Sequence, residues 1–396
     1  MKESAMNSQG SMGPALSGER VLDLTDEKGM LCSRLLSDMG AEVIRVEKAP
    51  EGSTRRLFSV AANLGKRSVT LDLDVAAGQE VFRRIVKTAD VVVESYQPGY
   101  MGALGLGYAG LSQINPRMIL VSITHFGQSG PYRDFQSCDM VASALGGQMS
   151  LCGEPQLPSL KPFANQAYSS ACLFAANGVL LALWQRHTSG RGQHVDISIQ
   201  ECVAATLDHA LVRYFYQGEV AKRQGSLHWN SAFRIFPCRD GYILLSLFQH
   251  WETLVEWLDD EAMAEDLLDR KWQDRDKRLE QLDHVIGVLE RWTVKHTVAE
   301  LVEKGQSMRF PWAEVSSIPG LVDNPQLKER GFWVEVEHPE SGEKYKFPGA
   351  AAKLSRSPWR VGGHVPSFGE HNMEIYHGEL GLFEKDIVAL IKEGVI

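Results

Sequence analysis

The candidates for acid/base or nucleophilic chemistry in this sequence are Asp139, Glu154, Glu370 and His371. Asp139 and Glu154 precede a long stretch, residues 157–192, that contains no aspartate or glutamate. Asp139 is placed to satisfy backbone N–H groups at a helix start, and Glu154 is typical of a solvated loop side chain. Glu370 and His371 form an adjacent acid/base pair, but their place just before a C-terminal helix favours a structural or capping contact. None of these groups is an evident nucleophile.

The stretch without carboxylates has a regular pattern. Residues 169–184 are typical of a helix rich in small side chains, interrupted only at Asn177-Gly178. A glycine-containing turn at 188–193 follows, and then an alternating strand at 194–199. Small side chains on such a helix allow another backbone to approach closely, which favours tight packing between chains.

The turn and the strand carry a recognisable motif, TGxGQxVDxS. The sequence matches it at Gly190, Gly192, Gln193, Val195, Asp196 and Ser198. On this motif, and on the upstream segments VLDLT, MGAEVIRVEKAPEG, KRSVTLDL and ADVVVESYQPG, the chain resembles the class III CoA-transferases, the family of formyl-CoA transferase and carnitine CoA-transferase. The resemblance covers nearly everything from residue 18 to residue 396.

The resemblance implies a catalytic aspartate ten residues before a helix glycine, which is Gly178 here. That position is Tyr168, and its neighbours from 164 to 170 lack a carboxylate. Class III transfer uses a carboxylate to attack the donor thioester, forming a mixed anhydride and then an enzyme-bound CoA thioester. A phenol with an ordinary pKa of about 10 cannot carry an acyl group in this way. The resemblance therefore implies a chain that has lost its own nucleophile.

A heteromer of duplicated subunits, of which only one is catalytic, explains a chain that keeps the family's scaffold but has lost part of its active site. The resemblance then implies a paralogous, Asp-containing partner subunit in a heterodimer or heterotetramer. That partner would accept the acyl group of succinyl-CoA, and CoA would pass to a carboxylic acid such as (R)-benzylsuccinate. Two alternatives stay open: a homodimeric CoA-ester hydrolase, lyase or isomerase in which water or another group replaces the nucleophile, and a catalytically silent CoA-ester-binding scaffold. Coenzyme A thioesters are expected as substrates, with no covalently bound cofactor and no metal.

The CoA-contacting positions of the family can be carried over residue by residue. They fall on Lys48, Leu71, Ser95, Tyr96, Tyr100, Ala103 and Thr124. The family usually has arginine or lysine at positions 103 and 124, and each charge-assisted bond of that kind contributes about 1.5–3 kcal/mol, so their loss predicts weaker CoA binding. The rings of Tyr96, Tyr100 and Phe126 could flank an adenine or a substrate ring, or could pack in the core.

The elements that must position these residues alternate along the first half of the chain. Strands are expected at 21–24, 42–47, 68–73, 90–94 and 118–123, with helices at 28–39 and 76–88. This alternation predicts an α/β fold with a Rossmann-like parallel sheet and right-handed crossovers. The turn after the first strand lacks GxGxxG, which disfavours a dinucleotide site. This turn is a residue shorter than in the family and carries Asp26-Glu27, which would repel an anion.

The expected domain boundaries give a large domain and a small one. They are a disordered leader at 1–17, a large domain at 18–215, a linker at 216–240, a small α+β domain at 241–333 and a return to the large domain at 334–396. The small domain is expected to contain a strand at 242–247, a helix at 251–258 and a charged helical stretch at 259–304. The family's flexible glycine-rich loop has no counterpart in 225–236. The resemblance also implies chains that interlock as rings in a dimer.

Composition excludes several classes of protein. The 396 residues carry a formal net charge of −9, so no basic surface indicates nucleic-acid binding. The six cysteines are scattered without a CxxC pair, which indicates reduced thiols and a cytoplasmic location. No apolar run approaches the roughly 20 residues that a membrane span needs, so no membrane association is expected.

Overall fold

A computed structural model describes residues 13–48, 57–228, 232–337, 342 and 344–396. The chain divides into two compact units, one of residues 1–149, 161–220 and 325–396 and the other of 150–160 and 221–324. The domain boundaries expected from the sequence differ from these bounds and remain a prediction. The first twelve residues of the expected leader lie outside the described residues, whereas Leu16 is buried and its N–H donates to the Met39 carbonyl (3.0 Å).

The larger unit is built on a six-stranded sheet in which every neighbouring pair is parallel. In spatial order its strands are β3 (Arg67–Thr70), β2 (Glu42–Glu47), β1 (Arg20–Leu24), β4 (Val91–Glu94), β5 (Ile119–Thr124) and β6 (His194–Ser198). The predicted α/β class and parallel sheet are confirmed. The strand order reverses between β1 and β4, and open α/β sheets bind ligands beside the carboxyl ends of the strands at such a reversal.

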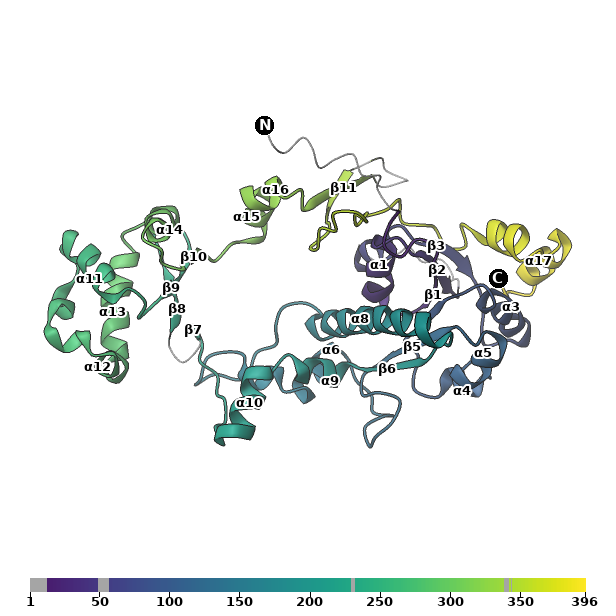
Figure 1. Cartoon of the computed structure of the whole chain (residues 1–396), viewed down its shortest axis with the longest axis horizontal. Helices are drawn as coiled ribbons and strands as arrows, with labels where there is room; N and C mark the ends of the chain where they lie inside the picture. Colours follow the sequence, from purple (N-terminus) through teal and green to yellow (C-terminus); the bar gives the residue numbers. More distant parts are fainter. Residues whose placement is uncertain (1–12, 49–56, 229–231, 338–341, 343) are drawn as a thin grey trace. The chain divides into compact units, whose positions relative to one another are not determined.

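One face of the sheet is covered by helices α1, α6, α8 and α9, as Figure 1 shows. Their bounds are Met30–Asp38, Asp139–Leu145, Gln166–Ser189 and Ile199–Ala205. The long helix α8 runs through Asn177-Gly178 without a break, so the expected interruption is wrong. A Cβ at Gly178 would lie 3.0 Å from Val195 Cγ1, so this glycine allows close packing on β6 rather than breaking the helix.

The glycines of the TGxGQ-like turn have distinct structural reasons. Gly190 ends α8 with a φ of 70°, the left-handed conformation that glycine adopts at low cost. A Cβ on Gly192 would lie 1.9 Å from the Met118 carbonyl oxygen, so any other residue would push β6 away from the start of β5. The motif therefore fixes how α8 enters the sheet.

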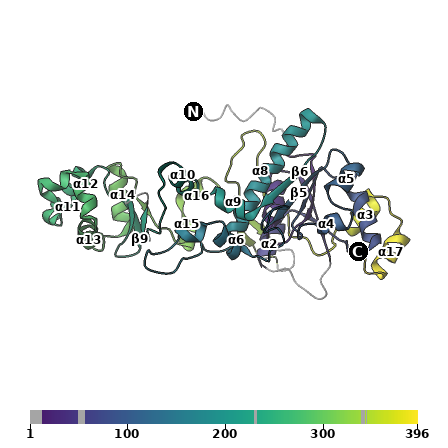
Figure 2. The same cartoon turned by 90° about the horizontal axis from the view of Figure 1, so that it is seen from below.

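The opposite face is covered by α3 (Ala76–Val86), α4 (Tyr100–Ala103), α5 (Tyr108–Ile114), a π-helical turn (Met373–Glu379) and α17 (Glu384–Lys392). Figure 2 shows α3, α4, α5 and α17 gathered on this side of the sheet. The returning chain also closes the free edge of β3. Ser68 and His371 exchange two hydrogen bonds (2.9 and 3.2 Å), Thr70 N donates to Asn372 Oδ1 (2.9 Å), and Asp72 N donates to the Val395 carbonyl (2.7 Å).

The smaller unit contains a four-stranded antiparallel sheet, β10-β9-β8-β7, packed against helices. Its strands are β7 (Leu227–His228), β8 (Phe233–Pro237), β9 (Tyr242–Ser246) and β10 (Ala313–Glu314). Its longer helices are α11 (Trp251–Asp260), α13 (Leu282–Thr293) and α14 (Val298–Ser307). The Glu261 carboxylate joins α11 and α13 because it accepts hydrogen bonds from the indole N–H groups of Trp257 and Trp292, both 2.7 Å.

Shorter elements complete the two units. They are α2 (Leu57–Asn63), α7 (Gln148–Leu151), α10 (Asp208–Gln217), two 3₁₀ turns (Glu265–Leu268 and Arg270–Gln273), α12 (Arg275–Glu280), α15 (Ile318–Asp323), α16 (Pro325–Glu329), and the ribbon of β11 (Trp333–Glu337) and β12 (Lys344–Pro348). Strands β7 and β8 lie within the stretch that the sequence analysis treats as a linker.

Two helices of the larger unit leave apolar side chains exposed. The 24-residue α8 is long and apolar enough, by length and composition alone, to cross a membrane, which the sequence pattern did not predict because polar residues such as Ser169 and Asn177 interrupt the apolar run. Half of its apolar window is buried in the unit. Its outer side exposes Leu181 and Trp184, and α10 buries none of its ten residues while exposing Phe215 and Tyr216. Such a surface is typical of a protein interface.

Candidate functional site

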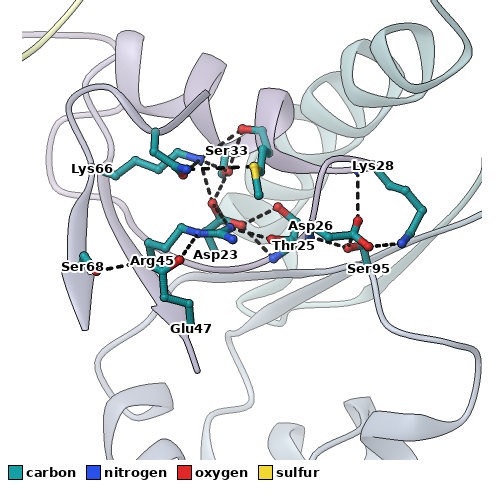
Figure 3. A network of polar contacts seen from close by, with 12 residues as sticks. Asp23, Thr25, Asp26, Lys28, Ser33, Arg45, Glu47, Lys66, Ser68 and Ser95 are labelled. Atoms are coloured by element: carbon teal, nitrogen blue, oxygen red, sulfur yellow. Dashed lines mark hydrogen bonds and ion pairs between the residues drawn. The ribbon is translucent and has the colours of Figure 1, made fainter. Parts of the chain in front are cut away.

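The carboxyl end of β1 carries a fully buried aspartate held by two cations (Figure 3). Asp23 Oδ2 lies 2.7 Å from Lys66 Nζ and 3.2 Å from a guanidinium nitrogen of Arg45. Ser33 Oγ also donates to this oxygen (2.7 Å). Burial alone would raise the pKa of Asp23, but the charges of Lys66 and Arg45 outweigh it and hold the pKa below its ordinary range.

This network fixes the turn that follows β1. Asp23 Oδ1 accepts hydrogen bonds from the backbone N–H and the hydroxyl of Thr25 (2.9 and 2.6 Å), and Arg45 donates to the Thr25 carbonyl (2.6 Å). The next residue, Asp26, is joined to Ser95 at the end of β4: its N–H donates to Ser95 Oγ, and Ser95 Oγ donates to its carboxylate, both 2.9 Å. Lys28 also pairs with Asp26. Figure 3 shows the contacts of Asp23 and those of Asp26 beside each other.

The end of β4 carries a second buried carboxyl, Glu94. Its Oε2 accepts a hydrogen bond from the Tyr96 N–H (2.8 Å), and its carboxyl also bonds the Ser122 hydroxyl. Burial raises the pKa of Glu94 to about 7, more than these hydrogen bonds and the charge of Lys28 lower it. Glu94 is thus a carboxyl that titrates near neutral pH beside the site.

Tyr168 lies in the first turns of α8 and is bonded to the end of β5. Its hydroxyl is 3.1 Å from His125 Nε2. Burial raises the pKa of Tyr168 above its ordinary value, and the negative charges of Glu27 and Asp26 raise it further. Burial and the charge of Lys28 lower the pKa of His125 to about 4, so its imidazole is neutral at pH 7. A neutral phenol and a neutral imidazole therefore face each other.

Asp139 holds the start of the same helix. Its Oδ1 accepts a hydrogen bond from the Tyr168 N–H (3.1 Å), and its Oδ2 pairs with Lys161 (2.9 Å). The expected capping role is correct in kind, but the helix it serves is α8 and not its own helix α6. The sequence could not show this, because the two residues are 29 positions apart.

The structure brings four of the expected CoA contacts together beside the ends of β2, β3 and β4. The rings of Tyr96 and Tyr100 lie 4.6 Å apart, and the Tyr100 hydroxyl donates to Asp74 (2.6 Å). Lys48 reaches the same group through Asp72 (2.7 Å) and Asp74 (3.6 Å). Leu71 is buried in the core cluster against which both rings pack. Lys48 already has two carboxylate partners, so a phosphate would compete with them.

The other candidates lie elsewhere. Phe126 packs among aromatic rings at the end of β5, 6.1 Å from Tyr132 and 6.3 Å from the His125 ring, in the group that contains Tyr168. Thr124 is buried beside it, and its hydroxyl has no hydrogen-bond partner among the described residues. Ala103 ends α4 and offers no polar group.

The three remaining acid/base candidates make other contacts. Glu154 belongs to the smaller unit, where its carbonyl accepts a bond from Arg223 (3.2 Å). His371 bonds the backbone of β3, and Glu370 pairs with His364 (2.7 Å). Both are structural contacts of the returning chain. No group of histidine, cysteine, aspartate and glutamate side chains that could hold a metal ion occurs in the described part of the chain.

Sequence reasoning missed His125 and Glu94. Their only sequence signal is their place at the carboxyl ends of predicted strands, where α/β proteins gather functional groups. The candidate site therefore consists of polar side chains and an aromatic pair at the carboxyl ends of a doubly wound parallel sheet, near the point where the strand order reverses.

The protein class follows from the comparisons. The model of CoA-transferase family III matches residues 16–372, and the chain belongs to this family. The BbsE subunit of succinyl-CoA:(R)-benzylsuccinate CoA-transferase from Thauera aromatica is 33% identical, over 97% of this chain and 99% of that protein. Succinyl-CoA–D-citramalate CoA-transferase from Chloroflexus aurantiacus is 32% identical, over 99% and 100%. A CaiB/BaiF family protein from Brucella suis superimposes with a TM-score of 0.81 at 27% identity, over 93% and 100%.

Proposed function

We propose that this chain is the nucleophile-lacking subunit of a heteromeric class III CoA-transferase that moves CoA from succinyl-CoA to a carboxylic acid. One observation carries the proposal: Tyr168, at the position where the family resemblance expects the catalytic aspartate, is a buried phenol bonded to the neutral His125. Burial and the neighbouring carboxylates disfavour the ionised phenolate, so the group does not act as an acyl-accepting anion.

The partner in this proposal is a paralogous chain that carries the aspartate. The exposed apolar residues of α8 and α10 support such a partner, because none of the ten residues of α10 is buried within this chain. The BbsE relative is itself named as a subunit, and it acts on succinyl-CoA and (R)-benzylsuccinate. We take (R)-benzylsuccinate as the acceptor to test first. The D-citramalate relative is within one percentage point in identity, so identity alone does not select the acceptor.

The test is to purify this chain alone and together with its paralogue, to weigh both by native mass spectrometry, and to assay CoA transfer from succinyl-CoA to benzylsuccinate. We expect transfer only by the pair, a mass that corresponds to a heteromer, and hydroxylamine trapping that labels an aspartate of the partner. Full activity of the partner without this chain would overturn the proposal.

A second candidate keeps catalysis in this chain, as a homodimer with another carboxylate in place of the missing one. One observation favours it: Glu27, in the turn after β1, acts electrostatically on the Tyr168 hydroxyl. Its carboxylate has no hydrogen-bond or ion-pair partner within the described ranges of the chain. Turnover by the isolated chain that disappears in Glu27→Gln but persists in the neighbouring Asp26→Asn would favour this candidate over the first.

A further inference from the structure

Glu94 directly precedes two of the candidate CoA contacts, Ser95 and Tyr96, in the chain. It is the last residue of β4 and only 3% exposed. Its carboxyl accepts a hydrogen bond from the Tyr96 N–H (2.8 Å). The conformation of the backbone that carries Tyr96 therefore depends on this carboxyl.

The charges of the described residues around Glu94 do not neutralise it. Lys28 faces it from the turn after β1, but this lysine pairs with Asp26. Asp196 faces it from β6 and acts in the opposite direction, since it raises the pKa of Glu94. Ser122 from β5 contributes a hydroxyl and no charge. A buried carboxylate without a cation of its own is costly, and protonation removes that cost.

The structure also contains a route for the proton. The Ser122 hydroxyl bonds the Glu94 carboxyl on one side and lies 2.9 Å from His194 Nε2 on the other. His194 is exposed at the start of β6 and stacks on Tyr108, with ring centroids 6.0 Å apart. A proton can therefore pass between Glu94 and solvent through two side chains, without opening the core.

We propose that Glu94 takes up a proton when a CoA thioester binds beside Ser95 and Tyr96, and that it is a positioning residue that makes CoA-ester binding dependent on pH. The inference rests on the proposed CoA-ester binding of this chain. CoA is a polyanion, so its phosphates disfavour the ionised form of the Glu94 carboxyl next to Tyr96. By linkage, a ligand that disfavours the ionised form binds more tightly when the proton is present. The proton comes from solvent, and no other bond forms or breaks.

The experiment is isothermal titration calorimetry of CoA into the full chain at pH 7, in phosphate and in Tris, whose ionisation enthalpies differ. The difference in heat gives the number of protons taken up. The 3′-phosphate of CoA also titrates near this pH, so the quantity that decides is the difference between the native chain and Glu94→Gln. The carboxamide keeps an acceptor for the Tyr96 N–H but cannot take up the proton.

We expect smaller proton uptake by Glu94→Gln, and a Kd for the native chain that rises above pH 7 by up to about tenfold per pH unit relative to this variant. Equal uptake by the two proteins would overturn the inference and leave CoA binding in place. Absence of CoA binding by both would instead overturn the proposed CoA site, and the coupling with it.

Two further variants separate coupling from structure. Ser122→Ala removes a hydrogen bond that lowers the pKa of Glu94, so the pH of maximal uptake should move upward. Asp38→Asn alters another buried carboxyl of the same unit, one that is ion-paired with Arg34 at 2.7 Å, and should leave uptake unchanged. Loss of uptake in Asp38→Asn would show a general effect of instability and would contradict a specific role for Glu94.

Discussion

Asp23 and Glu94 lie near the carboxyl ends of neighbouring strands of one sheet. Both are nearly inaccessible to solvent, yet their surroundings differ completely. Asp23 has two cations and two hydroxyl donors, so it stays ionised and fixes the turn after β1. Glu94 has one backbone donor and one hydroxyl but no paired cation among the described residues, so it titrates near neutral pH. Burial alone does not decide what a carboxyl does at such an edge. The presence of a paired cation separates a structural group from a responsive one.

The largest effect should come from removing Asp23, the carboxylate whose charge is balanced by two cations. Asp23→Ala leaves Lys66 and Arg45 buried without their carboxylate, which should cost about 3–5 kcal/mol of unfolding free energy. Urea unfolding followed by circular dichroism measures the loss. The pKa of Asp23 lies below its ordinary 3.8, so its stabilisation is complete above that pH and is lost as pH falls through the lower folded value.

The control for this variant is an exposed ion pair. Glu280→Ala removes the partner of Lys277, 2.7 Å away on the surface of the smaller unit. Its unfolding midpoint should not move measurably. Equal midpoints for Asp23→Ala and Glu280→Ala would show that the buried network is not structural.

Glu94→Gln sharpens the comparison through pH. The folded pKa of about 7 lies above the ordinary 4.5, so the folded state binds the proton more tightly and loses stability as pH rises between these values. At about 1.4 kcal/mol per pKa unit, the gap corresponds to on the order of 3 kcal/mol at pH 8. Glu94→Gln should lack this slope and be the more stable protein at pH 8. A variant whose stability follows the native chain from pH 5 to 8 would contradict this.

His125 at the end of β5 should give the opposite slope. Its folded pKa of about 4 lies below the ordinary 6.5, so the unfolded state binds the proton more tightly and stability falls as pH drops from 6.5 towards 4. For a partly exposed ring, screening reduces the effect to on the order of 1–2 kcal/mol. Unfolding curves of His125→Asn at pH 7 and pH 4.5 measure it: the variant should lose less stability on acidification than the native chain.

The smallest effect should come from Tyr168→Phe. The substitution removes one hydrogen bond to His125 and should cost about 0.5–1.5 kcal/mol. In the heteromer that we propose, it should leave the rate of CoA transfer unchanged. A tenfold loss of kcat with an intact heteromer would mean that the hydroxyl takes part in catalysis, against the proposed division of labour.

Much of the larger unit could be predicted because its pattern is local. The strand over Glu42–Glu47 has the predicted bounds, and β1, β4 and β5 differ by a residue or two. The predictions failed where distant parts decide. Gly178 stays helical because it packs on Val195, and Lys66 meets Asp23 across 43 positions. No local pattern places His125 against Tyr168, so the candidate site emerged only in part from the sequence.

The closure of β3 by the returning chain has a consequence for synthesis. The open edge of β3 is complete about 300 residues before His371 and Asn372, which cover it, are made. Exposed strand edges invite pairing with other chains, and contacts between distant residues form slowly. While the intervening residues leave the ribosome, the nascent sheet therefore exposes an unpaired strand edge that can pair with other chains. Folding yield should depend on how soon His371 and Asn372 reach it, and chaperones that shield strand edges should help most in that interval.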